Sequence, residues 1–248
     1  MYILSCSCLF SVQILQKLCM NKGIPTHIGI IMDGNRRWAK ERGKLAMQGH
    51  LQGYETLKKI ANHAFGKGLA VLTVFAFSSE NWLRSKTEVN FLLKLFWRMV
   101  TEELAEFQRM GVRVRFIGDL SRFPDELRKG MEHTMKETAG NTGGTLQIAA
   151  SYGGREEIVR AVRAIVAAKT SPDAIDEDMI ARHLYTADVS DPDLIIRTSG
   201  EERLSGFLPW QGVYSELLFL KKHWPAFTSR DFDAAVEEYA SRQRRFGK

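Results

Sequence analysis

The sequence predicts an α/β protein with a mainly parallel sheet of about six strands surrounded by helices. Short apolar runs rich in β-forming residues alternate along the chain with longer segments of helical periodicity. Such alternation is typical of parallel strands joined by helices that cover the faces of the sheet. No linker or internal repeat interrupts it after residue 26. With 248 residues, 44% of them hydrophobic, the chain is long enough for one large domain with an ordinary core.

Six runs are expected to form the strands. Each is short and apolar, as in "HIGIIM", "AVLTVFAF", "VRVRFI" and "TLQIAA", and such residues favour a pleated, buried surface. In chain order the expected strands span residues 27–32, 70–77, 112–117, 145–150, 193–197 and 215–220.

Six segments between and after these runs are expected to form helices. In the second of them, apolar residues from Val89 to Val100 recur at helical spacing. Asp176 and Ser229 are the expected N-caps of the last two helices. The expected helices span residues 52–67, 88–109, 124–138, 154–168, 176–184 and 229–244.

The composition narrows the classes of function. A net charge of +6 suggests acidic partners such as nucleic acid, anionic lipid or phosphorylated small molecules. Nucleic acid is disfavoured because no element carries a stripe of alternating basic and aromatic residues. Cysteines occur only at Cys6, Cys8 and Cys19, which argues against a disulfide framework and a zinc site and fits a reducing cytoplasm.

Residues 1–23 form an N-terminal extension that differs from the rest of the chain. The first twenty are apolar but carry Gln13, Gln16 and Lys17, so they are short and polar for a transmembrane span. They also lack the basic region and the cleavage site of a secretory signal. A peripheral membrane anchor, a disordered tail, and sequence upstream of a native start at Met20 stay open, and the last two are favoured. A single domain is therefore expected over residues 24–248.

The first expected strand ends directly at the charged stretch "DGNRRW", residues 33–38. In parallel sheets ligands gather beyond the carboxyl ends of the strands, so a ligand is expected here. Gly34 lets the backbone approach that ligand, and Arg36 and Arg37 can bind phosphate oxygens. Asp33 would repel a bare phosphate, so an acid fits if a hard cation such as Mg²⁺ lies between them. A strand-end turn with solvated arginines is the alternative.

A second polar cluster, "FSSENW", follows the second expected strand. It could bind, orient and cover a substrate, or it could be a capped turn into the next helix. Its members are Ser78, Ser79, Glu80, Asn81 and Trp82, with Arg84 next to them.

A third cluster, "RTSGEERLSGF", follows the fifth expected strand. Arg197, Arg203 and Ser205 form another anion-binding set beside the flexible Gly200, and Glu216 begins the last strand. Three arginine-bearing clusters at strand ends, each with an acid or amide, argue for two phosphorylated substrates and a metal.

Several enzyme classes are excluded by the motifs that the sequence lacks. It has neither the GxxxxGK[ST] loop of nucleotide-binding proteins nor the GxGxxG turn of dinucleotide-binding proteins. A phosphatase with an aspartyl nucleophile would usually carry a second acid two residues later, where this chain has Asn35. The DDxxD helices of trans-type prenyl synthases are also missing, because no two aspartates are adjacent.

Six motifs together resemble those of the cis-prenyltransferases, the undecaprenyl diphosphate synthase family. In order they are "HIGIIMDGNRRWA", "GH" at 49–50, "FSSENW", "GNTGGTLQIAASYGGREEI", "DPDLIIRTSGEERLSGFLPWQ" and "YSEL". The resemblance covers about residues 24–247. No single motif is decisive, but six in register are very specific.

The resemblance implies a homodimeric transferase with an apolar tunnel. It would add isopentenyl diphosphate repeatedly to an allylic diphosphate, usually farnesyl diphosphate, and make new cis double bonds with Mg²⁺. A long-chain product such as undecaprenyl diphosphate would be the lipid carrier precursor for cell-wall synthesis. The expected location is the cytoplasm, and peripheral contact with the inner face of the plasma membrane is left open.

The resemblance also implies roles for individual residues. Asp33 would hold Mg²⁺ at the allylic diphosphate, and Glu216 would reach the metal, from this subunit or its partner. Asn81, with Ser78 nearby, would help to remove the proton from the isopentenyl unit. The allylic group would be bound by Gly34, Asn35, Arg36, Arg37, Trp38 and His50. Isopentenyl diphosphate and the closing loop would involve Ser79, Glu80, Trp82, Arg84, Arg197, Arg203, Leu204 and Ser205.

Two positions near these motifs are informative. Many bacterial relatives carry an arginine where this chain has Ala46, so one diphosphate contact is missing or comes from Arg42 or Lys44. Gly144 is expected near the far end of the tunnel, where many relatives carry a larger apolar residue.

A non-catalytic partner subunit with the same fold is the alternative function, but it would be expected to have lost the acid, the amide or the arginine–serine set.

Overall fold

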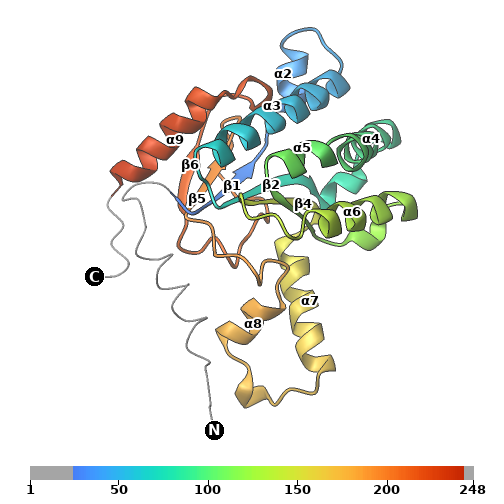
Figure 1. The fold of residues 1–248 in the computed structure, drawn as a ribbon, viewed down its shortest axis with the longest axis vertical. Coiled ribbons are helices and arrows are strands. Elements are labelled where there is room, and N and C mark those ends of the chain that lie inside the picture. Colours follow the sequence, from blue (N-terminus) through green and yellow to red (C-terminus); the bar gives the residue numbers. More distant parts are fainter. Residues whose placement is uncertain (1–24, 243–248) are drawn as a thin grey trace.

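The six expected strands form one sheet in the structure, a computed structural model that describes residues 25–242 (Figure 1). All neighbouring strands are parallel, in the order β3-β4-β2-β1-β5-β6, which confirms the predicted α/β class. Their bounds are His27–Ile31 (β1), Val71–Ser78 (β2), Arg113–Ile117 (β3), Thr145–Tyr152 (β4), Leu194–Arg197 (β5) and Glu216–Phe219 (β6).

The helices follow the predicted pattern with several differences. The α-helices are α2 (Asn35–Lys40), α3 (Ala46–Gly66), α4 (Lys86–Glu102), α5 (Leu104–Arg109), α6 (Asp125–Glu137), α7 (Gly154–Ala167), α8 (Glu177–His183) and α9 (Ser229–Ser241). Short 3₁₀ turns are η1 (Ser79–Leu83), η2 (Leu120–Arg122), η3 (Pro172–Ala174) and η4 (Trp224–Ala226).

Three expectations about the helices are corrected, and α2 is a helix that was not expected. Helix α2 begins within the charged stretch after β1, and α3 starts six residues earlier than the apolar pattern indicated. The single helix expected over 88–109 is interrupted at Glu103, whose carboxylate hydrogen-bonds to Tyr54 and Lys58. The N-cap of α9 is Thr228 rather than Ser229, because the Thr228 hydroxyl accepts from the amide of Asp231. Asp176 caps α8 as predicted.

Some predictions concern residues outside the described range. These are the N-terminal extension with its three cysteines and the end of the last helix beyond residue 242. Within residues 25–242 no helix combines the length and the apolar character needed to cross a membrane.

The two faces of the sheet bury different side chains because strand residues alternate in direction. On one face Ile28, Leu72 and Ile148 join a large core with apolar residues of α3, α4, α6 and α9. On the other face a smaller core gathers around Phe207, which stacks on Phe75 of β2. The large core therefore lies between this face of the sheet and α3. It extends away from the carboxyl end of β1.

Helices α7 and α8 pack on each other and extend away from the sheet (Figure 1). One face of α7 leaves Val159, Val162 and Val166 exposed to solvent. Their spacing of three and four residues forms an apolar stripe on this helix.

His27 predicts how stability depends on pH. Its ring is 1% exposed and lies between the Ser190 carbonyl, which can only accept, and the Thr73 hydroxyl. Neutral imidazole satisfies both partners, and burial lowers the pKa of His27 to about 4.

The unfolded chain therefore binds this proton near pH 6.5 and the folded chain does not. Stability is complete above pH 6.5 and falls as the pH approaches 4, with His27 alone contributing about 3 kcal/mol to the loss. Urea unfolding at pH 7, 6 and 5 measures this effect. An equal pH dependence in a folded His27→Gln variant would refute the assignment to His27.

Candidate active site

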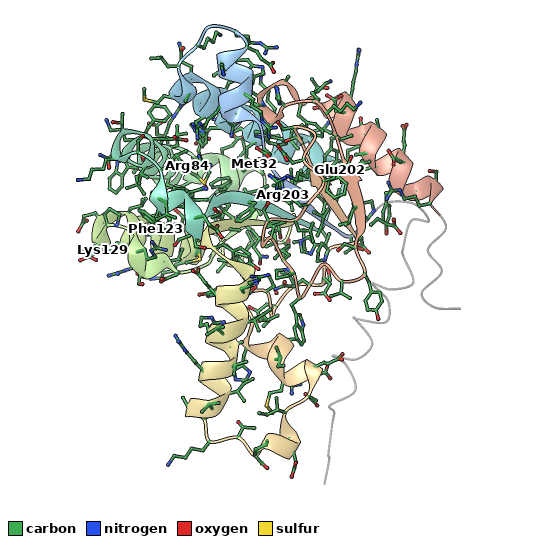
Figure 2. All side chains as sticks on the ribbon, turned by 180° about the vertical axis from the view of Figure 1, so that it is seen from behind. Met32, Arg84, Phe123, Lys129, Glu202 and Arg203 are labelled. Atoms are coloured by element: carbon green, nitrogen blue, oxygen red, sulfur yellow. The ribbon has the colours of Figure 1, made fainter. Side chains whose placement is uncertain are left out.

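A cavity of about 850 Å³ opens at the carboxyl ends of β1, β2 and β5, and we call it the main cavity. The predicted clusters after β1, β2 and β5 each contribute to its wall, as expected for neighbouring parallel strands. Met32 and Arg84, two of its lining residues, are labelled in Figure 2. The predicted site residues in its wall are Asp33, Gly34, Asn35, Arg36, Arg37, His50, Ser78, Asn81, Arg84, Arg197 and Ser205.

Asp33 lies between two arginines at the end of β1. Its Oδ2 accepts from Arg197 Nη2 at 2.9 Å and pairs with Arg37 Nη2 at 3.1 Å. Burial by itself would raise the pKa of Asp33, but the hydrogen bond from Arg197 and the charge of Arg37 outweigh it and hold the pKa below its ordinary value. Asp33 is thus ionised at neutral pH.

Gly34 makes the sharp turn between Asp33 and α2. Its φ is 101°, and a Cβ there would lie 2.6 Å from Ser199 Oγ and 2.7 Å from His223 Nδ1. Only glycine satisfies both the left-handed backbone and the close approach. The turn places the first amides of α2, which have no acceptor within the helix, beside the cavity.

Arg197 connects this turn to the third cluster. Its guanidinium is 5% exposed and donates to the Ser205 hydroxyl at 2.8 Å and to the Arg203 carbonyl, besides Asp33. Ser205 itself has a positive φ of 49°. Arg197 therefore holds the 203–205 loop in a conformation that is sparsely populated for a serine.

The wall of the main cavity is strongly cationic. Among the described residues that line it, the cations are Arg36, Arg37, Lys40, Lys44, Arg84 and Arg197, against the one carboxylate of Asp33. Such a concentration of charge in a concave site attracts anions. The cavity is therefore suited to a phosphorylated ligand.

The surroundings of Ala46 show which cation could replace the arginine that is expected at this position. The charged groups of Arg42 and Lys44 both lie over the Trp38 ring, at 4.7 and 5.2 Å from its centre, but Lys44 lines the cavity together with Ala46 and Arg42 does not. Of the two substitutes considered for a missing arginine, Lys44 is the one in the cavity wall.

The second cluster forms the turn η1 after β2. Asn81 Oδ1 accepts from the Ser78 backbone amide at 3.2 Å, so the Asn81 side chain caps the turn, and both residues line the cavity. Trp82 turns away, donating from Nε1 to Ser151 Oγ at 3.0 Å and packing on Phe123, which Figure 2 labels. Trp82 thus anchors the turn to the core.

Glu88, which the sequence analysis did not single out, ties this turn to α3. Its Oε1 accepts from Arg84 at 2.8 Å and lies 3.0 Å from Nε2 of His50. The four-residue spacing of Arg84 and Glu88 on the chain was a signal that could have indicated the pair. The carboxylate orients two groups that face the cavity.

This contact gives a prediction for the His50 titration. Burial lowers the pKa of His50, and the Glu88 carboxylate opposes that effect because it stabilises the imidazolium. A Glu88→Gln variant is expected to lower the pKa of His50 further, as measured by NMR titration of the ring protons. An unchanged or higher pKa would contradict the assignment.

Seven predicted site residues lie outside the cavity wall: Trp38, Ser79, Glu80, Trp82, Arg203, Leu204 and Glu216. Arg203 is exposed and pairs with Glu201, which also accepts from Arg37 at 3.0 Å. Glu201 is thus a second acid next to Arg37, and no role was predicted for it from the sequence. Leu204 packs on the smaller core.

Glu216 lies at the opposite end of the sheet from Asp33. It begins β6 and is level with Leu194 and Ile28 at the amino ends of β5 and β1, roughly 15 Å from Asp33 along the strands. Its carboxylate accepts from Arg242 at 3.0 Å. Within one subunit Glu216 and Asp33 cannot share a metal, so only the version with a partner subunit stays a prediction.

The donor groups around Asp33 fit one kind of metal site. The described residues contain no cluster of three or more acidic, histidine or cysteine side chains that could enclose an ion. Mg²⁺ needs no such cage, because it commonly uses one or two carboxylates together with substrate phosphates and water. A single ionised carboxylate in a phosphate-binding cavity fits that pattern.

Two smaller apolar cavities continue behind the main cavity. The middle cavity, about 70 Å³, shares Met32, His50, Ala76 and Leu92 with the main cavity. The far cavity, about 30 Å³, lies beyond it between α3, α4, α5 and the amino end of β4. The main and middle cavities share wall residues, and so do the middle and far cavities. We call this row of three, which leads from the cations into the large core, the path of cavities.

Comparison with known proteins gives a family match over most of the chain. Residues 31–247 match the family model described as "Putative undecaprenyl diphosphate synthase". An isoprenyl transferase of Clostridium perfringens is 48% identical over 228 residues, covering 90% of each chain. One of Agrobacterium fabrum is 49% identical over 228 residues, covering 90% of this chain and 92% of that protein.

Two solved structures are similar over most of the chain. Lavandulyl diphosphate synthase from Lavandula x intermedia, in complex with dimethylallyl diphosphate, has a TM-score of 0.89 and 36% identity, covering 92% of this chain and all of that one. A "probable undecaprenyl diphosphate synthase" from Campylobacter jejuni has a TM-score of 0.76 and 34% identity, covering 90% and 99%.

Proposed function

The chain belongs to the undecaprenyl diphosphate synthase family of cis-prenyltransferases, and from this premise we propose a specific substrate pair and product class. It is an isoprenyl transferase that elongates a prenyl chain. The proposed starter is an allylic diphosphate, in the first instance farnesyl diphosphate, and the proposed extender is isopentenyl diphosphate. The product would be a long-chain polyprenyl diphosphate such as undecaprenyl diphosphate.

The observation that carries the proposal is the change of character along the path of cavities. At the carboxyl ends of the strands the wall is cationic, and behind Met32 and Leu92 it becomes apolar. A prenyl diphosphate has the same division between a charged head and an apolar tail. Binding it head-first at Asp33 would place the tail against α3, where hydrophobic burial stabilises it.

The cations of the site are paired with carboxylates that a diphosphate would replace. Arg37 and Arg197 hold Asp33, and Arg84 holds Glu88, whose carboxylate also contacts the His50 ring. Phosphate oxygens form charge-assisted hydrogen bonds with the same guanidinium groups. The carboxylates would thus keep the arginines oriented until the substrates arrive, so that little reorganisation is needed at the moment of reaction.

The proposed reaction joins C4 of isopentenyl diphosphate to C1 of the allylic substrate while the C1–O bond breaks and diphosphate leaves. A proton is then lost from C2 of the isopentenyl unit. Asp33 would hold Mg²⁺, which when bound neutralises charge on the leaving diphosphate. Asn81 and Ser78 line the wall where the isopentenyl unit would lie, and an amide is too weak a base to keep the proton, so it would orient the group that accepts it.

The proposal includes a homodimer and a single catalytic domain over residues 24–248. The valine stripe of α7, with exposed Val213 and Tyr214, supplies apolar surface that a second copy could cover. In a dimer Glu216 could approach a neighbouring site, as the resemblance implies. We place the enzyme in the cytoplasm, where its lipid product would call for contact with the inner face of the plasma membrane.

The test is to incubate the protein with farnesyl diphosphate, isopentenyl diphosphate and Mg²⁺ and to analyse the products by mass spectrometry. A series of products that differ by one isoprene unit is expected, with NMR showing cis geometry at the new double bonds. Omitting isopentenyl diphosphate is the control. A folded protein that incorporates none would favour the non-catalytic partner subunit instead.

A further inference from the structure

Tyr54 of α3 stands between the middle and far cavities. Together with Leu57 and Met99 it lines both of them, so its ring is part of the wall that divides the apolar path. The side chain is nearly fully buried at 6% exposure. Along the axis of α3, Tyr54 lies about 6 Å beyond His50, and Phe65 lies about 22 Å beyond it.

A charged group fixes the tyrosine ring in place. The Tyr54 hydroxyl donates to Glu103 Oε1 at 3.0 Å, and Lys58 Nζ donates to the same oxygen at 2.7 Å. Burial and the neighbouring carboxylate raise the pKa of Tyr54, so the hydroxyl keeps its proton and stays a donor. We call this set of Tyr54, Glu103 and Lys58 the latch.

The latch is unusual for its surroundings. Glu103 is 6% exposed and lines the far cavity, whose wall is mainly apolar, with residues such as Ala61, Phe107 and Leu146, but also includes Lys58, Asn62 and Glu106. A buried carboxylate is stabilised only if its hydrogen bonds are satisfied, and here Tyr54 and Lys58 supply them. Moving the Tyr54 ring aside would leave this acceptor short of one donor, which has a free-energy cost.

We infer that Tyr54, held by Glu103 and Lys58, determines how far the growing prenyl tail extends and thereby sets product length. The inference rests on the proposed function, since it assigns the apolar path to the tail. A tail that reaches the middle cavity meets the tyrosine ring, and further growth requires the ring to leave its latch. Release of the product then competes with that movement.

The far end of the path shows what lies beyond the latch. The ring of Phe65 closes it against Gly144, where an added Cβ would lie 2.5 Å from Phe65 Cδ1. Phe65 thus occupies the space beside Gly144 that a larger residue at position 144 is expected to fill in many relatives. Opening the latch would add only the far cavity, so the expected gain in length is limited.

The experiment compares product lengths at equal total incorporation of isopentenyl diphosphate. Tyr54→Ala removes the dividing ring, and its longest main product is expected to gain at least one isoprene unit. Glu103→Leu and Tyr54→Phe keep the ring but break the latch, so both are expected to shift the distribution towards longer products. Glu103→Gln keeps an acceptor and should stay close to the unaltered enzyme.

Glu126→Leu is the control for replacing a glutamate by leucine, because Glu126 lies at the surface of α6, pairs with Lys129 and has no contact with the latch. It should leave the distribution unchanged. Lengths that stay the same or become shorter in both Tyr54→Phe and Glu103→Leu would overturn the inference. A shift in Glu126→Leu equal to that in Glu103→Leu would also overturn it. Failure of the unaltered enzyme to incorporate isopentenyl diphosphate would refute the proposed function instead.

Discussion

Replacing Asp33 by alanine is expected to lower turnover roughly 10²–10⁴-fold, which corresponds to about 3–5 kcal/mol of transition-state stabilisation. Substrate binding should weaken far less, because the cations of the main cavity still attract the diphosphate in the ground state. In the proposed mechanism Asp33 would act where negative charge grows as the C1–O bond breaks, so its loss would be felt mainly in the transition state.

The measurement is steady-state incorporation of isopentenyl diphosphate at saturating Mg²⁺, with a separate Kd for farnesyl diphosphate. Alanine would also leave the buried guanidinium of Arg197 without its carboxylate, so Asp33→Asn is a companion variant that keeps an oxygen facing it. A thermal melt shows whether both variants are folded.

Asp119 offers a matched control. Like Asp33, it follows the last residue of a strand by two positions, but it is exposed and does not line the main cavity. Asp119→Ala should keep turnover near that of the unaltered enzyme. Near-normal turnover in folded Asp33→Ala would refute the role proposed for this carboxylate.

The sheet could be predicted because each strand is a short, separate apolar run. Parallel strands buried on both faces need apolar residues at nearly every position, and β1 is buried throughout. Helix boundaries were harder, because the start of α3 carries Gly49 and His50 where an apolar pattern was sought. Whether these residues belong to the helix depends on their contacts elsewhere in the fold. The hydrophobic periodicity of the sequence does not show those contacts.

The residues of the site, like the secondary structure, could be predicted from the sequence only in part. Asp33, Arg37 and Arg197 could be placed together because the ends of neighbouring parallel strands meet at one edge. The pair of Arg37 and Glu201 could not be predicted, because it forms across the fold, whereas the pair of Arg84 and Glu88 was indicated only by its four-residue spacing. Trp82 was expected to cover the site, but an aromatic residue gives no indication of which side of a turn it takes.

The glycine of the "GH" pair shows this limit most clearly. From the sequence, His50 was expected to bind the allylic group, whereas no role was predicted for Gly49. In the structure α2 crosses α3 at this glycine, and a Cβ on Gly49 would lie 2.1 Å from the Asn35 carbonyl oxygen and 3.1 Å from the Ala39 Cβ. The first of these is a backbone atom, so it can move only if α2 moves with it.

Gly49→Ala is therefore expected to displace α2 and with it Arg36 and Arg37. Overpacking of this kind typically costs about 1–3 kcal/mol, which exceeds the gain of up to about 1 kcal/mol from the helix propensity of alanine. Turnover should fall by up to about 10²-fold, because a shift of about 1 Å in groups that position the substrate can have that effect.

Gly66→Ala separates the steric effect from the general effect of replacing a glycine in α3. Gly66 belongs to the same helix and has open space where a Cβ would be added, so this change should be neutral or slightly stabilising. Thermal melts and turnover of the two variants, measured side by side, test the difference. If Gly49→Ala melted as high as Gly66→Ala and kept its turnover, α2 would not depend on the close approach at Gly49 for its position over the main cavity.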